Sequence, residues 1–368
     1  MSNNDPKAND ANDFDHLVYV RLFEGCNLAC EHCFIPANPK KMSEDQLKTL
    51  PESFKKFAKP GQKLLIQWHG GEPTMLGPKL IRSTIEHWIA EYPEYTYSFG
   101  IQTNLMNYDE SWASLYRDHF DSKVGISWDP KIRLIRKDKP ETNSEFESIF
   151  WKNVDRLAVD KIEPYMVVTG TRIFFETFTN PVDFFELLEK HSIPAAHIER
   201  LTKTGVARDN WGTIGLTNRE YSNYMLRFSR AYFSYRSIKR PTESRSVYLS
   251  PFDGLKASLI RLSEGLTGGS GCLSGVCDTR FHTFDSNGYK KGCTALTSES
   301  DNKNSGVQVI QIMDYKFARK LRQQSCDGCE FMPICSSGCL ASEKWDESEE
   351  CSGSKILFKG TQDILIGH

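Results

Sequence analysis

The stretch Cys26-Asn-Leu-Ala-Cys30-Glu-His-Cys33 stands directly after an apolar, strand-like run at 16–23. It is a C-x3-C-x2-C arrangement of three thiols with no fourth cysteine nearby. Three thiolates can hold three irons of a cubane iron–sulfur cluster, which leaves the fourth iron open to a substrate or cofactor. A zinc site is the alternative, but zinc sites are usually built from paired C-x2-C units with four ligands. The stretch therefore favours an open, catalytic iron–sulfur site.

Strand-like runs recur along the chain after this first one, and each is followed by a helix-like pattern. The predicted strands are His16–Phe23, Lys63–His69, Thr96–Thr103, Lys123–Asp129, Glu163–Thr169 and Ala196–Leu201. Helix starts are predicted by capping boxes at Ser43 with Gln46, Ser144 with Glu147 and Thr217 with Glu220, and by Asn180 before Pro181. Six strand–helix units in series predict an α/β fold, a partial (β/α)6 barrel with a parallel sheet.

The other eight of the eleven cysteines lie in a Gly- and Ser-rich part of the chain near its C-terminal end. They read Cys272-x4-Cys277, Gly288-x4-Cys293, Cys326-x2-Cys329-x5-Cys335-x3-Cys339 and then Cys351. A small loop-rich module buries little surface and needs metals or clusters to stabilise it. We expect a disordered tail at 1–15, the barrel at 16–235, a bridging region at 236–270, a cluster-binding domain at 271–355 and a tail at 356–368.

Composition narrows the class of protein further. The net charge is −2 and no basic stripe stands out, which argues against a nucleic-acid-binding surface. No apolar run approaches the ~18 residues that a membrane span requires. The segment Met1–Asp15 lacks the apolar core of a signal peptide. Clustered thiols in a chain that is not secreted indicate metal or cluster ligation rather than disulfides. We therefore expect a cytoplasmic protein without a nucleic-acid or membrane partner.

The cysteine motif after the first strand resembles that of the radical S-adenosylmethionine (SAM) superfamily, and the C-terminal pattern resembles its SPASM extension. The resemblance implies three [4Fe–4S] clusters, one of which binds SAM and two of which are auxiliary. The SAM-binding cluster would be held by Cys26, Cys30 and Cys33. By the ligand order of the family, Cys272, Cys277, Cys293 and Cys339 hold the first auxiliary cluster, and Cys326, Cys329, Cys335 and Cys351 hold the second.

Two alternatives remain open for these C-terminal thiols. Some SPASM proteins leave one iron of the first auxiliary cluster open, which puts the role of Cys277 in question. Two zinc knuckles at the same positions are the other alternative. Eight thiols without a matching histidine pattern favour iron–sulfur clusters.

The resemblance also implies residues that contact SAM. Gly70-Gly71-Glu72-Pro73 resembles the GGEP motif that meets the SAM amino group, and glycines permit close backbone approach. Gln102-Thr-Asn104 resembles a Gln-Thr-Asn-Gly run that ends the third strand. Here Leu105 replaces the glycine of that run.

Ser127-Trp-Asp129-Pro130 resembles a Ser-Leu-Asp-Gly run whose serine contacts SAM. An arginine that follows it in the family binds the SAM carboxylate, and Arg133 and Arg136 are the candidates, with Arg136 preferred. His32 stands where the family often has an aromatic residue packed near adenine.

Membership would imply that SAM is cleaved reductively to a 5′-deoxyadenosyl radical, which abstracts a hydrogen atom from the substrate. SPASM enzymes mostly modify peptides, so we expect a ribosomally synthesised precursor peptide that is crosslinked (C–C, C–S or C–O) or epimerised. The expected partners are this peptide, an external reductant such as flavodoxin or ferredoxin, and a separate recognition protein if the chain itself does not bind the leader. Candidate acid–base residues are Asp278, Asp285 and Glu199.

Three other functions remain open. A sulfatase-maturase-like enzyme would form formylglycine, but Thr294 stands where those enzymes have an aspartate base after the Gly-x4-Cys cysteine. A radical SAM dehydrogenase of small molecules is the second. The third is an iron–sulfur electron carrier or binding protein without chemistry of its own, which would need neither the Gly70-Gly71 motif nor an open cluster.

Overall fold

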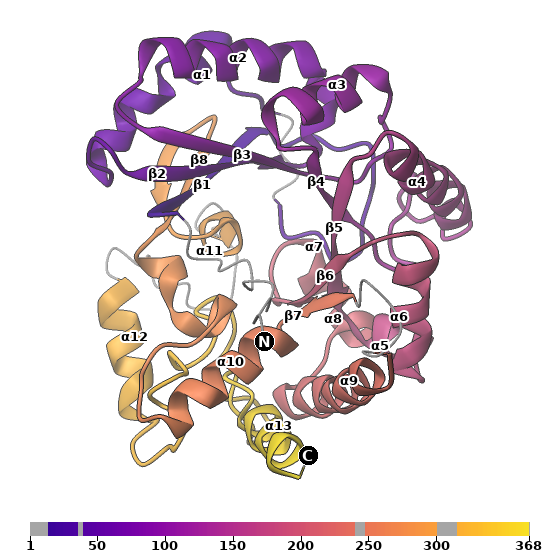
Figure 1. The fold of residues 1–368 in the computed structure, drawn as a ribbon, viewed down its shortest axis with the longest axis vertical. Coiled ribbons are helices and arrows are strands. Elements are labelled where there is room, and N and C mark those ends of the chain that lie inside the picture. Colours follow the sequence, from indigo (N-terminus) through magenta and orange to yellow (C-terminus); the bar gives the residue numbers. More distant parts are fainter. Residues whose placement is uncertain (1–13, 36–39, 240–246, 300–314, 368) are drawn as a thin grey trace, which may run out of the picture.

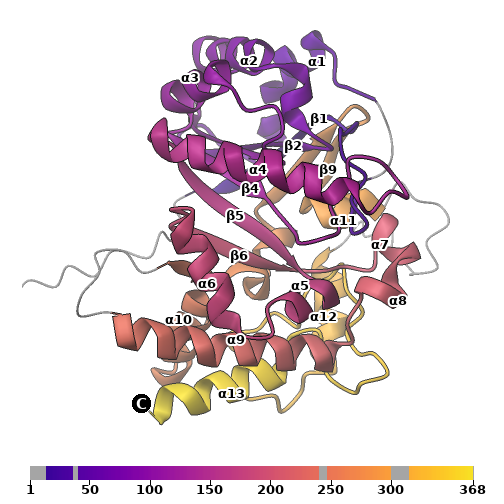
Figure 2. The ribbon, with the colours of Figure 1, turned by 90° about the vertical axis from the view of Figure 1, so that its right-hand side faces the viewer.

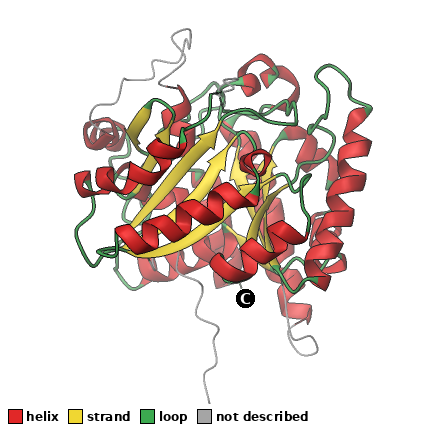
Figure 3. Cartoon of the chain, turned by 90° about the horizontal axis from the view of Figure 1, so that it is seen from above, coloured by secondary structure: helices red, strands yellow, loops and turns green. Residues whose placement is uncertain are grey.

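The computed structural model describes residues 14–35, 40–239, 247–299 and 315–367. Its centre is a nine-stranded sheet with the strand order β7-β6-β5-β4-β3-β2-β1-β8-β9. Neighbouring strands are parallel except β8 and β9, which are antiparallel. The sheet curves into an incomplete barrel with helices on its outside (Figures 1 and 3). This is the α/β barrel fold that the sequence predicts.

The strands are β1 (His16–Phe23), β2 (Lys63–Gly70), β3 (Thr96–Thr103), β4 (Lys123–Ser127), β5 (Glu163–Gly170), β6 (Ala195–Arg200), β7 (Tyr248–Ser250), β8 (Phe281–Asp285) and β9 (Gly288–Lys291). The helices are α1 (Glu44–Thr49), α2 (Pro78–Glu91), α3 (Glu110–His119), α4 (Thr142–Val159), α5 (Arg172–Thr177), α6 (Pro181–Lys190), α7 (Val206–Asp209), α8 (Trp211–Ile214), α9 (Asn218–Lys239), α10 (Phe252–Ser263), α11 (Thr294–Glu299), α12 (Tyr315–Gln324) and α13 (Lys355–Ile366). Short 3-10 turns are η1 (Leu50–Lys56), η2 (Pro73–Leu76), η3 (Gly271–Ser274) and η4 (Val276–Asp278).

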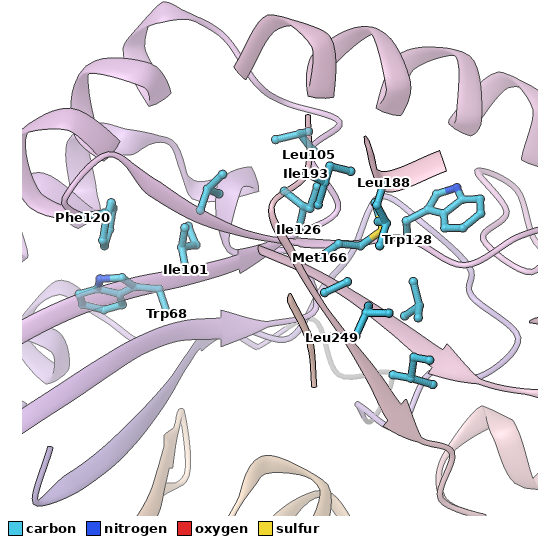
Figure 4. Close-up of a cluster of buried hydrophobic side chains, with 14 of the residues drawn as sticks. Trp68, Ile101, Leu105, Phe120, Ile126, Trp128, Met166, Leu188, Ile193 and Leu249 are labelled. Atoms are coloured by element: carbon cyan, nitrogen blue, oxygen red, sulfur yellow. The ribbon is translucent and has the colours of Figure 1, made fainter. Parts of the chain in front are cut away.

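The six strands predicted from hydrophobic runs coincide with β1 to β6 within two residues at each end. Alternate side chains of each strand are buried, as in β2, where Leu64, Ile66 and Trp68 are fully buried and the residues between them are partly exposed. Because side chains alternate between the two faces of a strand, one face packs under the helices and the other lines the barrel. Figure 4 shows part of the buried face, with Trp68, Ile101 and Met166 in one cluster.

Most predicted helix starts are confirmed. Ser43 and Gln46 form a reciprocal capping box, and Asn180 caps α6 with Pro181 at the first helical position. Thr217 and Glu220 exchange hydrogen bonds at the start of α9. The prediction at Ser144 is wrong, because α4 already begins at Thr142 and the Ser144 hydroxyl donates to the Glu141 carbonyl within the first turn.

The C-terminal part is joined to the barrel more closely than the sequence predicts. The expected bridging region contributes β7 and α10, and the hairpin β8–β9 extends the barrel sheet beside β1. Residues 355–366 form α13 instead of a tail, and α13 lies along α9 (Figure 2). Gly360 permits this close packing, since a Cβ atom at its position would lie 2.4 Å from the Leu226 side chain.

Two further expectations concern the surroundings of the fold. Of the predicted tail, residues 1–13 lie outside the described residues, whereas Asp15 is hydrogen-bonded to Lys63 at the start of β2. Among the helices of the described ranges, none is long and apolar enough to cross a membrane.

Candidate functional site

The loop that carries Cys26, Cys30 and Cys33, the cysteine triad, lies over the C-terminal ends of the barrel strands. Its Ala29 amide donates to the Leu134 carbonyl after β4 at 2.7 Å, and its Cys33 carbonyl accepts from the Val206 amide after β6 at 2.9 Å. Ligand-binding groups of parallel barrels collect at this end. The three residues that the motif predicted as ligands are therefore held together there.

The three thiols are electrostatic neighbours, with Cys30 and Cys33 partly buried and Cys26 exposed at the surface. Burial raises the pKa of Cys30, Arg133 opposes the rise, and Cys33 and Cys26 add to it. Burial likewise raises the pKa of Cys26 to about 12. Thiols of this kind ionise only when a nearby cation compensates their charge, which is what metal ligation provides. The donor set of the triad thus fits an iron–sulfur cluster.

The Gly70-Gly71 motif supports this loop through backbone contacts. The Gly71 amide donates to the Phe23 carbonyl and the Glu72 amide donates to the Gly25 carbonyl, both at 2.9 Å. A Cβ atom on Gly70 would lie 2.1 Å from the Phe23 oxygen, and one on Gly71 would lie 2.2 Å from the Gly25 oxygen. Side chains are excluded at both positions, so the glycines let the second loop press against the chain just before Cys26.

Glu72 joins three loops of the barrel. Its buried carboxylate accepts hydrogen bonds from the Thr74 amide at 3.0 Å, the Thr74 hydroxyl at 2.6 Å, the Thr103 hydroxyl at 2.7 Å and the Asn104 amide at 2.7 Å. These bonds stabilise its buried charge. Glu72 therefore holds the loops after β2 and β3 together. The next residue, Pro73, is buried and begins the turn η2.

The predicted polar residues at the ends of β3 and β4 also contact one another. The Asn104 side-chain amide donates to the Asn27 side chain at 2.7 Å and lies 3.9 Å from the Cys26 sulfur. The Gln102 side chain donates to the Ser127 hydroxyl at 2.7 Å. The structure therefore brings Asn104 to the triad and pairs Gln102 with Ser127 on neighbouring strands.

A buried His32–Asp129–Arg133 cluster borders the triad. The Asp129 carboxylate accepts from Arg133 Nε at 2.9 Å and from Nη2 at 2.7 Å, and it lies 3.2 Å from His32 Nε2. Arg133 Nη1 lies 3.9 Å from the Cys30 sulfur. Burial lowers the pKa of His32 to about 4, with Asp129 opposing and Arg133 supporting the change. The imidazole is therefore neutral at neutral pH.

Of the two arginine candidates, only Arg133 reaches the site. Arg136 is exposed, and its backbone amide donates to the Thr142 hydroxyl at the start of α4. Arg133, and not the preferred Arg136, is therefore the arginine that lies beside the triad. Sequence reasoning also passed over Asp129 as a site residue, although it stands in the quoted Ser-Trp-Asp run.

Cys272, Cys277, Cys293 and Cys339, the first quartet, gather beside the barrel. The charge of Glu199, then burial, and then Cys339, Cys277 and Cys293 raise the pKa of Cys272. The thiol of Cys293 has Cys277 and Cys339 as electrostatic neighbours. Cys277 is buried, Cys293 and Cys339 are partly buried and Cys272 is exposed, and the four thiols are electrostatic neighbours of one another.

Glu199 and Tyr19 connect the first quartet to the inner face of the barrel. The Cys272 sulfur lies 3.9 Å from a Glu199 oxygen at the end of β6, and Glu199 is 3.2 Å from His197. Although burial alone would raise it, the hydrogen bond and charge of His197 hold the pKa of Glu199 below its usual value. Burial raises the pKa of Tyr19 on β1, and Cys293 and Cys272 add to that rise.

Cys326, Cys329, Cys335 and Cys351, the second quartet, line a cavity of about 30 Å³ together with Lys344 and Phe358. Burial raises the pKa of Cys335 to about 11, the amides of Gly338 and Ser337 oppose the rise, and Cys351 and Cys326 add to it. Amide hydrogen bonds to sulfur are typical of iron–sulfur ligands, whose properties they tune.

None of the eleven cysteines is in a disulfide, and all of them belong to the described residues. Within those residues, no three Cys, His, Asp or Glu side chains close on a single metal ion. The triad and the two quartets are therefore defined by electrostatic proximity and, for the second quartet, by a shared cavity.

The other two predicted acid–base residues are Asp285 and Asp278, and the structure describes the side chain of Asp285 only. Asp285 is fully buried and accepts from Arg21 at 2.6 Å, from Lys290 at 2.8 Å and from the Asn287 amide at 2.8 Å. These bonds tie β8 to β1 and account for Asp285 without a catalytic role. Asp278 ends η4, and its side chain lies outside the described residues.

Comparison with known proteins identifies similar proteins for part and for most of the chain. Residues 20–130 match the family described as the radical SAM superfamily. An uncharacterized protein of Archaeoglobus fulgidus is 23% identical over 340 residues, which cover 88% of this chain and 74% of that protein. A serine-type anaerobic sulfatase-maturating enzyme of Klebsiella aerogenes is 25% identical over 131 residues, 34% of this chain and 32% of that enzyme.

Solved structures of similar fold cover most of the chain. The structure of anSMEcpe with bound AdoMet and the Cp18Cys peptide aligns with a TM-score of 0.64 and 19% identity over 95% of this chain and 96% of that one. Streptococcus suis SuiB bound to its precursor peptide SuiA aligns with a TM-score of 0.57 and 15% identity over 93% and 76%. The match over residues 20–130 spans the triad and the loops after β2 and β3, so this part of the chain is similar to the radical SAM superfamily.

Proposed function

We propose that this chain is a SPASM-type radical SAM enzyme that oxidises a ribosomally synthesised precursor peptide, with a crosslink as the product. In this assignment the triad holds the SAM-binding [4Fe–4S] cluster, and each quartet holds one closed auxiliary [4Fe–4S] cluster. The ligands are the eleven cysteines, three at the first site and four at each of the others. This count supports Cys277 as a ligand rather than an open iron beside it.

The residues around the triad would bind and orient SAM. When bound, the cluster and SAM supply a 5′-deoxyadenosyl radical that takes one hydrogen atom from the substrate. Gly70 and Gly71 hold the triad loop by their close backbone approach, and the motif that they begin would meet the SAM amino group. Arg133 presents Nη1 toward Cys30 while Asp129 holds its other nitrogens, which suits it to bind the SAM carboxylate. His32, neutral and buried, can pack against adenine.

The observation that carries an oxidative reaction is the contact of the first quartet with the inner face of the barrel. Glu199 on β6 and Tyr19 on β1 both lie beside it. A substrate bound in the barrel would therefore lie between the triad and the first quartet. An electron acceptor at that place supports net oxidation of the substrate, since crosslinking removes two hydrogens and epimerisation removes none.

A peptide substrate is supported by the contents of two similar structures. That of anSMEcpe contains a bound peptide, and that of SuiB contains the precursor peptide SuiA. A low-potential flavodoxin or ferredoxin would supply electrons to the triad cluster, which fits a location in the cytoplasm.

The test is the mass of a short peptide encoded beside this gene, co-expressed with the enzyme in heavy water. We expect the peptide to lose two hydrogens only when the intact enzyme is present, and Cys30→Ala to abolish the change. Gain of one deuterium at a carbon without mass loss would instead establish epimerisation. No change in any neighbouring peptide would contradict peptide maturation.

The relatives named as serine-type anaerobic sulfatase-maturating enzymes favour formylglycine formation as the second candidate. Thr294 follows Cys293 here, and because its side chain is a hydroxyl it offers no carboxylate base at that position. Incubation with serine- and cysteine-containing sulfatase peptides should yield no aldehyde, and aldehyde formation would reverse the order of the two proposals. Failure of the reconstituted, reduced protein to cleave SAM would favour an electron carrier instead.

A further inference from the structure

Helix α12 turns two arginines toward the cysteine quartets. Arg319 and Arg322 stand three positions apart and therefore share one face of the helix. Arg319 is buried, whereas Lys316 and Lys320 on the same helix are exposed. The helix thus separates its cations into an inner pair and an outer pair.

The inner pair contacts the first quartet directly. Arg319 Nη2 lies 3.8 Å from the Cys277 sulfur, and its Nη1 donates to the Ser336 and Gly338 carbonyls beside the second quartet's Cys335. Arg322 Nη1 donates to the Cys339 carbonyl at 2.6 Å. Burial lowers the pKa of Arg322 while Cys339 and Cys326 oppose that change, so this cation has a cysteine of each quartet as neighbour.

Lys344 supplies a third cation, at the second quartet. Its Nζ lies 3.0 Å from the Cys326 sulfur and also donates to the Ser325 hydroxyl and the Arg322 carbonyl. Among the described residues, Glu199 is an acidic neighbour of Cys272 and Glu350 is an acidic neighbour of Cys351. Arg319 and Arg322 therefore face the first quartet, and Lys344 and Arg322 face the second.

One-electron reduction of a [4Fe–4S] cluster adds one negative charge and no proton. A fixed cation beside a ligand sulfur stabilises the reduced form more than the oxidised form, because net charge and hydrogen bonds to sulfur set cluster potentials. A buried site strengthens the effect since its charges are poorly screened.

We propose that Arg319, Arg322 and Lys344 are positioning residues that raise the reduction potentials of the two auxiliary clusters and so make both clusters electron acceptors. The inference rests on the proposed function, which assigns a cluster to each quartet. In that function the electron comes from a substrate radical, which also releases a proton as its new bond forms.

Redox titration followed by electron paramagnetic resonance tests the proposal on the fully loaded enzyme. Lys344→Gln should lower the equilibrium constant for reduction of the second auxiliary cluster by about tenfold, equivalent to about 59 mV for a one-electron couple. Lys344→Arg should restore it. Lys320→Gln removes the same charge from the outer face of α12 and is the matched control, expected to move neither cluster by more than about twofold in that constant.

Arg319→Gln should shift the first auxiliary cluster in the same direction, and Arg319→Lys, which keeps the charge, should shift it less. If Arg319→Gln binds less iron, its role includes holding the loops, and the comparison of Lys344→Gln with Lys344→Arg decides the proposal. Equal potentials in Lys344→Gln, Lys320→Gln and the unchanged enzyme, at equal iron content, would overturn it. If the unchanged enzyme binds iron only at the triad, the proposed function fails instead.

Discussion

The Arg133 guanidinium is held between a carboxylate and a thiol. It donates twice to buried Asp129, and its remaining nitrogen lies 3.9 Å from the Cys30 sulfur. Arg136 stands three positions later in the same segment and is exposed. Either arginine could be the one that follows the Ser-Trp-Asp run and reaches the triad, as far as the sequence motif shows. Only the path of the chain after β4 determines that Arg133 lies there.

Arg133→Gln and Arg136→Gln form a matched pair for a first prediction. Removing one partner of a buried ion pair costs about 3–5 kcal/mol of folding free energy, whereas an exposed substitution changes it by about 0.5 kcal/mol or less. We expect Arg133→Gln to weaken SAM binding by at least tenfold, because ~1.4 kcal/mol corresponds to tenfold in affinity. Equilibrium dialysis with SAM measures this, and equal affinities of the two variants would contradict the assignment of Arg133.

At the scale of elements, the loops after β1 and β2 depend on each other. Gly70 and Gly71 permit backbone contact with Phe23 and Gly25, and Glu72 extends the contact to the loop after β3. The triad is therefore positioned by two further loops and not by its own segment alone. This explains why a glycine pair stands some 40 residues from the cysteines that it supports.

Gly71→Ala should disable the triad and spare the quartets. Its methyl group would lie 2.2 Å from the Gly25 carbonyl oxygen, a backbone atom that cannot rotate away. Overpacking of this kind costs about 1–3 kcal/mol. Gly212→Ala in α8 is the control, because no atom lies within 4 Å of its added Cβ.

We expect Gly71→Ala to lose the SAM-dependent resonance of the first cluster while iron remains at the auxiliary sites. Gly212→Ala should keep all of its iron. Iron analysis with electron paramagnetic resonance measures both variants. Full iron content and SAM cleavage in Gly71→Ala would show that the close approach of the two loops is not needed.

Helix α13 shows where local signals fail. It follows Ser354, a residue type that is common before helices, but this serine has a left-handed conformation and its side chain does not cap the helix. The helix instead buries Leu357 and Phe358, and Phe358 stacks on Phe331 beside the second quartet. Helices are stabilised mainly by such packing, which the sequence of the helix alone does not specify.

At the scale of the whole molecule, buried histidines should make stability depend on pH. Burial lowers the pKa of His69 to about 4, with help from Arg21, and lowers the pKa of His282 to about 3, with help from His16 and Lys291. An unfolded histidine titrates near 6.5, so the unfolded chain binds more protons than the folded chain between pH 3 and 6.5. Folding stability therefore falls as pH decreases through this window.

The expected loss from pH 7.5 to 5.5 is about 1.4 kcal/mol for each such histidine. His282→Gln should remove the part of this stability loss that comes from His282, because glutamine does not take up a proton in this pH range. The apparent melting temperature of the cluster-loaded enzyme, followed by circular dichroism at both pH values, measures the change. The same pH dependence in His282→Gln and in the unchanged enzyme would contradict a neutral, buried His282.

The sequence by itself determined the six strand–helix units, the triad after the first strand and the glycine pair after the second. It also grouped the eight C-terminal cysteines in one part of the chain. These features are local, because each can be recognised from a short stretch of sequence. They are strand periodicity, cysteine spacing and paired glycines after a strand. The tertiary structure decided which arginine meets the triad, that Asp285 is bonded to Arg21, and that Glu199 and Tyr19 border the first quartet. It also decided that α12 directs its arginines between the quartets, because contacts between residues far apart in sequence depend on how the elements pack.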